Sequence, residues 1–495
     1  MPARKYLLSF SLLGLLSIFA GCGGSASRPT PRGGFTASSV SGSYAFVFSG
    51  NDVNGLFGIA GSLQADGAGH ITSGVMDINQ NNSSGTPQPI TNQPFTGTYT
   101  VQADGRGVAT LSSTAGTFHL AFVIINAQRA LMTRFEQVAS GSGAMDLQTS
   151  SAFSNAALAG SFAFNLSGVD GVGAPFASAG SVTTDSTGAV TSGVVDSADN
   201  GSISQNVPVT SGALAVGSSN GRATLDITTA GGTVSFAAYI VDANHLKLVE
   251  TDTTTGAQLS GEAFRQPATL SNASFSGPFA FTVAGVDSGQ GLPFSAGGVL
   301  TADGAGTITS GTEDLSELNF NPLIGMAISN TSTYSISGVR GTLSLQTSNA
   351  TFNFAIYPTI SGVQVIETDA GVVGTGSAFG QTGPFTNNSI SGAYGMNFTA
   401  VIGTEVDTTA SLTADGTAGT LKGIIDINEL NTPGFPAPGT SLSGNYSVNA
   451  DGRGSFNLTT GLGTQTMAVY VVNNSRALFI EVDGGVVSVG AIEHQ

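Results

Sequence analysis

Short runs in which apolar and polar residues alternate recur along the whole chain, separated by glycine, aspartate and asparagine. Alternation with a period of two is typical of strands that bury one face. In the first part of the sequence the alternation predicts eight strands, and no run of helical period interrupts them. They cover residues 43–49, 57–65, 70–78, 95–102, 106–112, 117–125, 129–136 and 142–148. The pattern therefore predicts an all-β fold.

This strand pattern occurs four times. Each copy begins with Gly-x-aromatic and ends with Gly-x-x-x-x-Gln, and three joints share the motif Asn-x-x-apolar-x-Gly. Each copy is long enough to bury a core of its own. We therefore expect four tandem domains with short linkers, at residues 40–149, 155–266, 272–381 and 387–495. Eight sequential antiparallel strands close most simply as an up-and-down barrel, which leaves no exposed edge, and a β-sandwich is the alternative.

One hairpin is nearly identical in two distant copies, as TVQADGRGVATL at residues 100–111 and SVNADGRGSFNL near the end of the chain. Tyr99 and Leu111 can share a core face only if residues 103–105 form a loop with Gly105 in the left-handed conformation. The arginine that follows then points outward. We interpret this arginine as part of a solvated rim or an inter-domain contact, in preference to an anion site. It is Arg106, Arg222, Arg340 or Arg453 in the four copies.

The composition agrees with a packed β protein, because 40% of the residues are hydrophobic and 9% are charged. The formal net charge is −17. Nucleic acids and anionic membrane surfaces need clusters of lysine and arginine, so this charge disfavours both as partners. It is typical of a soluble acidic surface.

The N-terminus has the order of an export signal. Arg4 and Lys5 precede an apolar run over residues 6–20, and small residues follow up to Cys22. The stretch Phe-Ala-Gly-Cys resembles the lipobox of a bacterial lipoprotein, although Phe19 stands where leucine is usual. Cys22 is also the single cysteine of the chain, so it has no disulfide partner.

The lipoprotein resemblance implies that the signal peptide, residues 1–21, is removed and that Cys22 is acylated, with palmitate among the attached chains. Residues 22–39 then form a flexible tether. Gly23, where aspartate would retain a lipoprotein in the inner membrane, implies sorting to the outer membrane or cell surface. The expected location is the cell envelope, with the membrane as a partner through the lipid anchor.

Acidic residues recur near the ends of the third and seventh strands of each copy. We expect them to converge as an acidic rim around each barrel mouth. The set is Asp77, Glu136, Asp196, Glu250, Asp252, Asp314, Glu367, Asp369, Asp426, Glu481 and Asp483; the first copy has Arg134 where the others have the glutamate. Three interpretations stay open: solvated strand ends, a Ca²⁺ or sugar site, and a glycosidase with paired carboxylates.

The four histidines fall at unrelated positions in the repeats, so the sequence indicates no metal cluster and no catalytic triad. The Gly-x-aromatic start and eight strands resemble the lipocalin or calycin superfamily, with an aromatic residue in place of its tryptophan: Tyr44, Phe162, Phe279 and Tyr394. That resemblance implies a barrel able to hold a small apolar ligand. The whole chain also resembles repeat lipoproteins of some environmental bacteria.

Together these features predict a non-enzymatic envelope protein that binds a ligand or glycan, or adheres, through four displayed copies. Two alternatives remain, a purely structural spacer and a glycan-active hydrolase that uses the rim carboxylates. We expect no cofactor other than Ca²⁺.

We expect a Cys22→Ser variant to leave the membrane fraction, because the substitution removes the thiol that would carry the lipid. The measurement is membrane fractionation of cells that express either form. Unchanged fractionation would contradict the anchor.

Overall fold

The computed structural model describes residues 34–217, 219–461 and 463–495. The predicted signal peptide and Cys22 lie outside the described residues. Helix within the described chain is confined to four 3-10 turns, η1 (Ala37–Ser39), η2 (Ser150–Ala152), η3 (Asn272–Ser274) and η4 (Asn387–Ser389). Among these residues we find no helix with the length and hydrophobicity needed to cross a membrane.

The first and fourth units are closed eight-stranded barrels in which each strand pairs antiparallel with its chain neighbours. In the first unit β1 pairs with β8, and in the fourth β27 pairs with β34. The barrel architecture is therefore confirmed. The strands are β1 (Ser41–Asp52), β2 (Gly55–Asp66), β3 (His70–Gln80), β4 (Ile90–Val101), β5 (Arg106–Ser113), β6 (Gly116–Asn126), β7 (Arg129–Glu136) and β8 (Ala139–Leu147); and β27 (Gly392–Val401), β28 (Glu405–Asp415), β29 (Thr420–Glu429), β30 (Ala437–Val448), β31 (Arg453–Thr460), β32 (Gly463–Asn473), β33 (Arg476–Glu481) and β34 (Val487–His494).

The second and third units are curled nine-stranded sheets because their fourth strand is broken in two. In the second unit the halves are the two ends of the sheet. The Val209 N–H bonds to the Gly193 carbonyl and the Leu214 N–H bonds to the Gly188 carbonyl, so both halves lie along the third strand of the unit. The strands are β9 (Gly160–Val169), β10 (Pro175–Thr184), β11 (Val190–Asp199), β12 (Ser202–Pro208), β13 (Ser211–Val216), β14 (Arg222–Thr229), β15 (Gly232–Asp242), β16 (His245–Glu250) and β17 (Gln258–Arg265); and β18 (Ser276–Asp287), β19 (Leu292–Asp303), β20 (Ile308–Glu317), β21 (Leu323–Ala327), β22 (Thr333–Ser337), β23 (Arg340–Gln346), β24 (Thr351–Pro358), β25 (Val363–Glu367) and β26 (Val372–Gly380).

Each unit has its own apolar core, and the joint before it contributes a buried apolar residue at the same position of the repeat. These residues are Val40, Leu158, Phe275 and Ile390. In the first unit the Tyr99 hydroxyl donates to the Val40 carbonyl at 2.7 Å. Phe35 and Ala37 also pack against this core, so the last residues of the segment predicted as a tether belong to the first barrel.

The repeated hairpin has the predicted geometry. Gly105 has a φ of +86°, in the left-handed region, and the Gln102 N–H bonds to the Arg106 carbonyl at 2.7 Å across the turn. Gly452 in the other near-identical copy has a φ of +87°. A side chain at either position would be strained, which explains why the turn keeps glycine there.

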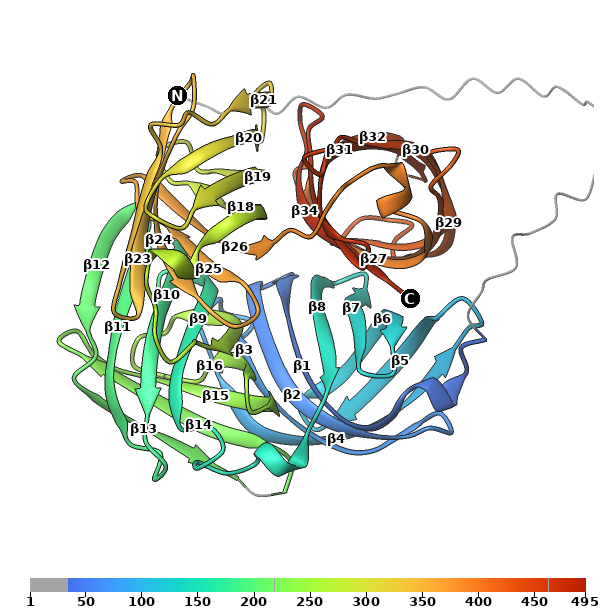
Figure 1. The fold of residues 1–495 in the computed structure, drawn as a ribbon. Coiled ribbons are helices and arrows are strands. Elements are labelled where there is room, and N and C mark those ends of the chain that lie inside the picture. The colour runs from blue at the N-terminus through green and yellow to red at the C-terminus, as the bar shows by residue number, and fades with distance from the viewer. Residues whose placement is uncertain (1–33, 218, 462) are drawn as a thin grey trace, which may run out of the picture.

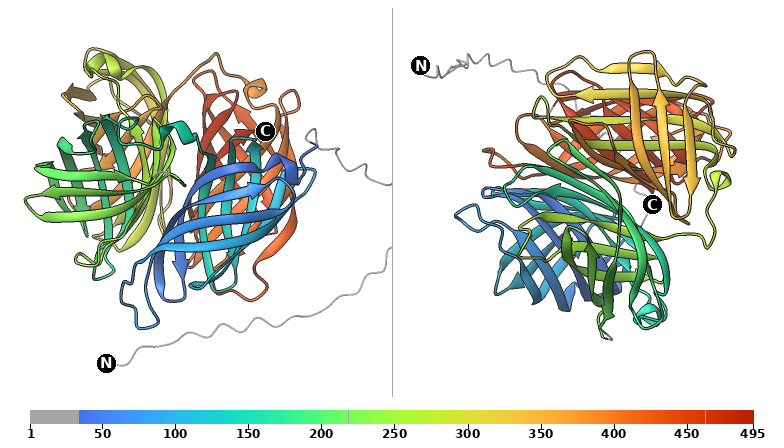
Figure 2. Two further views of the ribbon diagram at one scale, coloured as in Figure 1. Left: turned by 90° about the horizontal axis from the view of Figure 1, so that it is seen from below. Right: turned by 90° about the vertical axis from the view of Figure 1, so that its left-hand side faces the viewer.

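The four units lie around a closed ring in which the fourth unit meets the first (Figure 1, Figure 2). The outer faces of neighbouring barrels are apolar where they meet. Tyr239 packs with Val47 between the first two units, and Tyr470 packs with Val299 between the last two. The units therefore form one packed body.

An arginine–aspartate pair connects the units at every junction. Strands are numbered here within each unit, with a broken fourth strand counted as one. The arginine that begins strand 5 of each unit binds the aspartate in strand 3 of the unit before it, and the first unit binds the fourth in the same way. The nitrogen–oxygen distances are 2.7 Å for Arg222–Asp77, 2.6 Å for Arg340–Asp196, 2.6 Å for Arg453–Asp314 and 2.8 Å for Arg106–Asp426. A contact that repeats head to tail and returns to its start forms a ring.

The final glutamine of each unit makes a second set of junction contacts. Its side-chain amide donates to a strand-6 carbonyl of the next unit: Gln148 to Ile240, Gln266 to Pro358, Gln381 to Val471 and Gln495 to Ile124, at 2.7 to 3.0 Å. The last of these connects the C-terminal residue to the first barrel. The repeated Gly-x-x-x-x-Gln motif is thus an interface motif.

Candidate functional site

The predicted acidic rim is wrong for the strand-3 aspartates. Asp196 has no exposed surface, and it accepts hydrogen bonds from Arg340, from the Tyr357 hydroxyl and from the backbone N–H of Asn206. Asp77, Asp314 and Asp426 likewise face the arginine of the next unit. Strand alternation is the reason, because the residues on either side of each aspartate face the barrel interior.

The second acidic residue of strand 7 has a local structural role. Its carboxylate accepts a backbone N–H of strand 6 in three units and of its own turn in the second. The bonds are His119 to Glu136 at 2.7 Å, Asn353 to Asp369 at 2.8 Å, Thr466 to Asp483, and Thr254 to Asp252 at 2.6 Å. A Ca²⁺ site, one of the interpretations of the rim, would combine Asp314 with Glu367 and Asp369 in the third unit. These residues are not brought together, since Asp314 faces Arg453 of the next unit.

The strand-7 glutamates Glu250, Glu367 and Glu481 are buried. Burial raises the pKa of Glu481 to about 7, and burial together with Asp369 raises the pKa of Glu367 well above its usual range. Glu313, which the sequence analysis missed, is buried in the third barrel, and burial raises its pKa to about 8. These carboxyl groups are therefore protonated at pH values where an exposed glutamate is ionised.

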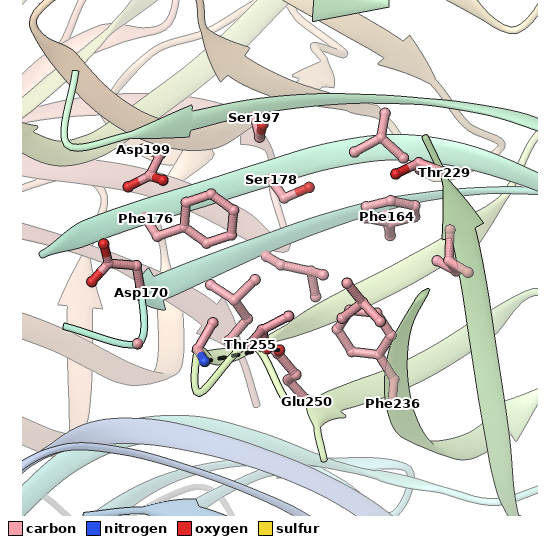
Figure 3. A pocket seen from close by; sticks show the side chains of 17 residues that line it. Phe164, Asp170, Phe176, Ser178, Ser197, Asp199, Thr229, Phe236, Glu250 and Thr255 are labelled. Carbon is pink, nitrogen blue, oxygen red and sulfur yellow. Dashed lines mark hydrogen bonds between the residues drawn. The ribbon is translucent and has the colours of Figure 1, made fainter. Parts of the chain in front are cut away.

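Glu250 differs because it lines a cavity of about 290 Å³ in the second barrel (Figure 3). The wall is mainly apolar, with Phe164, Phe176 and Phe236 among its residues. One Glu250 oxygen, Oε1, accepts a hydrogen bond from the Thr255 hydroxyl at 2.7 Å, while Oε2 is buried without a partner. Burial raises the pKa of Glu250 to about 8.

The cavity exists because two cross-strand positions carry small side chains. Ser178 pairs with Ser197 across β10 and β11, and both line the cavity. The register places Ile59 and Ile78 at these positions in the first barrel, where both are packed in the core. Replacing two isoleucines by serines removes apolar volume that the rest of the barrel does not refill.

The opening of the cavity is acidic. Asp170 follows β9 and Asp199 ends β11, and the two lie next to each other beside Phe176 (Figure 3). Burial and the neighbouring Asp170 raise the pKa of Asp199. Of the residues that line the cavity, every charged one is an acid: Asp170, Asp199 and Glu250.

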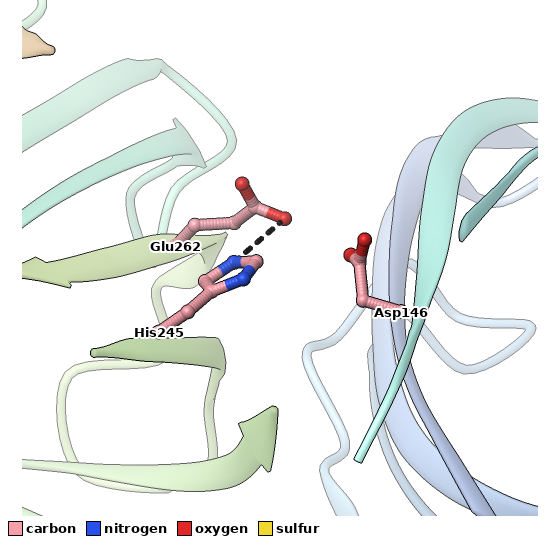
Figure 4. Close-up of side chains that lie close together, drawn as sticks. All are labelled: Asp146, His245 and Glu262. Carbon is pink, nitrogen blue, oxygen red and sulfur yellow. Dashed lines mark ion pairs between the residues drawn. The ribbon is translucent and has the colours of Figure 1, made fainter. Parts of the chain in front are cut away.

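A second group of charged side chains lies where the units meet around the ring axis. Asp146, His245 and Glu262 are close enough to hold a metal ion (Figure 4). The Lys247 ammonium already lies between the carboxylates, at 2.8 Å from Asp146 and 2.6 Å from Glu262. Burial alone would raise the pKa of Asp146, but Lys247 and Arg129 lower it to about 2. Lysine thus takes the place that a cation would occupy.

No family model matches the chain, and no curated protein matches it. Among solved structures, a double mutant of transferrin binding protein B from Haemophilus parasuis Hp5 is 8% identical, with a TM-score of 0.18 over 92% of this chain and 77% of that one. A single mutant of that protein is 9% identical, with a TM-score of 0.19 over 91% of this chain and 75% of that one. Intact Ap-TbpB, with its N and C lobes, is 8% identical, with a TM-score of 0.20 over 92% of this chain and 77% of that one. Similarity at this level supports no argument about function.

The buried glutamates predict how stability changes with pH. The pKa values of Glu250, Glu313 and Glu481 are raised to about 8, 8 and 7 in the folded chain. These groups therefore stay protonated in the folded chain at pH values above about 4 to 5, where they are ionised in the unfolded chain. The free energy of unfolding should therefore fall by about 1.4 kcal/mol per pH unit for each group, from pH 5 to about 7 for Glu481 and to about 8 for Glu250 and Glu313. Urea denaturation across this range measures the trend, and Glu313→Gln should make the fall less steep, because it removes one of the contributing groups. Stability that rises from pH 5 to 8 would contradict the assignment.

Proposed function

We propose that this chain is a lipid-anchored protein of the cell envelope that binds a small ligand without transforming it, and that the cavity of the second barrel is its binding site. The observation that carries the proposal is this cavity of about 290 Å³, with mainly apolar walls and a buried polar group. Small-molecule sites have this composition, since apolar walls supply binding energy and a few polar groups fix orientation.

The position in the envelope is supported by the sequence. Arg4 and Lys5, the apolar run and the single cysteine at Cys22 together have the order of a lipoprotein signal. An outer-membrane or surface location follows from the absence of aspartate after Cys22. The described residues begin 12 positions after that cysteine, at Gly34, so the anchor and the ring are close in the chain.

The structure of the ring favours one binding site, in the second barrel, over an equal site in each of the four barrels. Each barrel packs against two neighbours, and the junctions fix its position relative to the others. The interiors differ, as the Ser178–Ser197 pair and its isoleucine counterparts show. Three barrels then provide a rigid frame that holds the second barrel and its loops in place.

An apolar fluorescent probe, N-phenyl-1-naphthylamine, tests the binding site in the full chain carrying Cys22→Ser. We expect one probe per chain, because one cavity carries the proposal. The double variant Ser178→Ile/Ser197→Ile, which installs the first barrel's residues, should weaken probe binding at least tenfold because it fills the cavity.

Ser192→Ile is the matched control, since Ser192 is exposed on the same strand, β11. It should leave probe binding unchanged. Equal binding by the chain and the double variant, or no binding by either, would contradict the proposed site.

A further inference from the structure

The interior of the second barrel contains an unused hydrogen-bonding group. Glu250 has no exposed surface, and its Oε2 atom has no partner among the described residues. Buried polar atoms in folded proteins are almost always bonded, because an unbonded one loses its hydration without replacement. The free oxygen belongs to a residue that lines the cavity, so a donor on a bound molecule would satisfy it.

The charge of the cavity selects the kind of donor. Its charged lining residues are Asp170 and Asp199 at the opening and Glu250 within, and none of the lining residues is basic. The carboxylates of Asp170 and Asp199, joined by that of Glu250 once it has lost its proton, repel an anion and attract a cation. The aromatic rings of Phe164, Phe176 and Phe236 attract a cation through their faces and contact an apolar body through their area.

In the first barrel the side chain of an arginine places a cation at the position that Glu250 has in the second. Arg134 stands at the position of Glu250, and its guanidinium lies 4.7 Å from the centre of the Phe57 ring and 5.1 Å from that of Phe118. Phe57 is the counterpart of Phe176, since each pairs with the last residue of strand 3. The mouth of the first barrel is therefore filled by its own side-chain cation, whereas the second barrel has an acid at that position and an open space.

We infer that the second barrel binds a small organic cation, a molecule with one ammonium group on an apolar body, and that Glu250 Oε2 accepts a hydrogen bond from the ammonium. This inference rests on the proposed function of the cavity and names the ligand class. The apolar body would lie between the three phenylalanines, with Ser178 and Ser197 leaving the space for it. Ammonium and carboxylate then form a buried pair with a charge-assisted hydrogen bond.

The charged groups around Glu250 make this binding depend on pH. Asp252 on the adjacent turn and the lining residues Asp170 and Asp199 are all acidic, and burial raises the pKa of Glu250 to about 8. Glu250 must lose its proton to pair with an ammonium. Affinity for the amine should therefore increase about tenfold per pH unit between pH 6 and 7, and should level off near pH 8.

Displacement of N-phenyl-1-naphthylamine by three ligands of similar size tests the inference: 2-phenylethylamine, 2-phenylethanol and 3-phenylpropionate. We expect the amine to displace the probe at a concentration at least tenfold below that of the alcohol, with the carboxylate weakest. Glu250→Gln should weaken binding of the amine at least tenfold and remove the pH dependence of that binding, and it should leave binding of the alcohol unchanged.

The outcomes separate this inference from the proposed function. If the alcohol and the amine compete equally in the unchanged chain, the cavity is a binding site and the inference of a cation is overturned. If Glu250→Gln binds the amine as well as the unchanged chain does, the role of Glu250 is overturned. If the probe itself does not bind, the proposed function fails and the inference fails with it. The double variant Ser178→Ile/Ser197→Ile should lose all three ligands.

Discussion

The architecture depends on a buried arginine–aspartate pair at each junction between barrels. Removing two charges from water is costly unless each is fully bonded, and breaking such a pair by removing one partner costs about 3 to 5 kcal/mol. Asp196 is satisfied by Arg340, by Tyr357 and by a backbone N–H group, and Asp77 and Asp314 have equivalent partners. Since arginine and aspartate come from neighbouring repeats, neither repeat satisfies its charges alone. The repeats are thereby coupled into one body, and the fourth pair closes the ring.

This coupling explains features of the sequence that a single barrel would not need. Strand 6 is apolar at consecutive positions, as in Phe236 to Val241, because one face fills the barrel core and the other packs on the neighbouring unit. The chain can then carry 40% hydrophobic and 9% charged residues without a large exposed apolar surface. The coupling also gives the two faces of each strand different constraints. Outward-facing residues must fit the neighbouring unit, whereas inward-facing residues vary between barrels. The cavity of the second barrel arises from that freedom, through Ser178 and Ser197.

Local rules predicted most of the fold. Alternation placed all eight strands of the first unit, and the turn at Gly105 followed from the need to keep Tyr99 and Leu111 on one face. Such rules could not predict that each arginine pairs with an aspartate, because the two residues of a pair lie in different repeats. The orientation of Asp77 was nevertheless available: Met76 and Ile78 beside it face the core, so alternation points Asp77 outward. The cavity required the registers of three strands at once, since Ser178 matters only opposite Ser197 and beside Leu166.

Ring closure is tested most directly by the distance between the first and fourth units in solution. Val138 and Pro433 are exposed on loops that touch, where the Asn431 N–H bonds to the Gln137 carbonyl at 2.7 Å. Spin labels on Val138→Cys and Pro433→Cys, in a Cys22→Ser background, report this separation by double electron–electron resonance. A closed ring predicts one narrow distribution at the short end of the measurable range, broadened when Asp426→Lys breaks the closing pair with Arg106. A broad distribution at long distances in the unbroken chain would show that the barrels are strung out independently and would contradict the account.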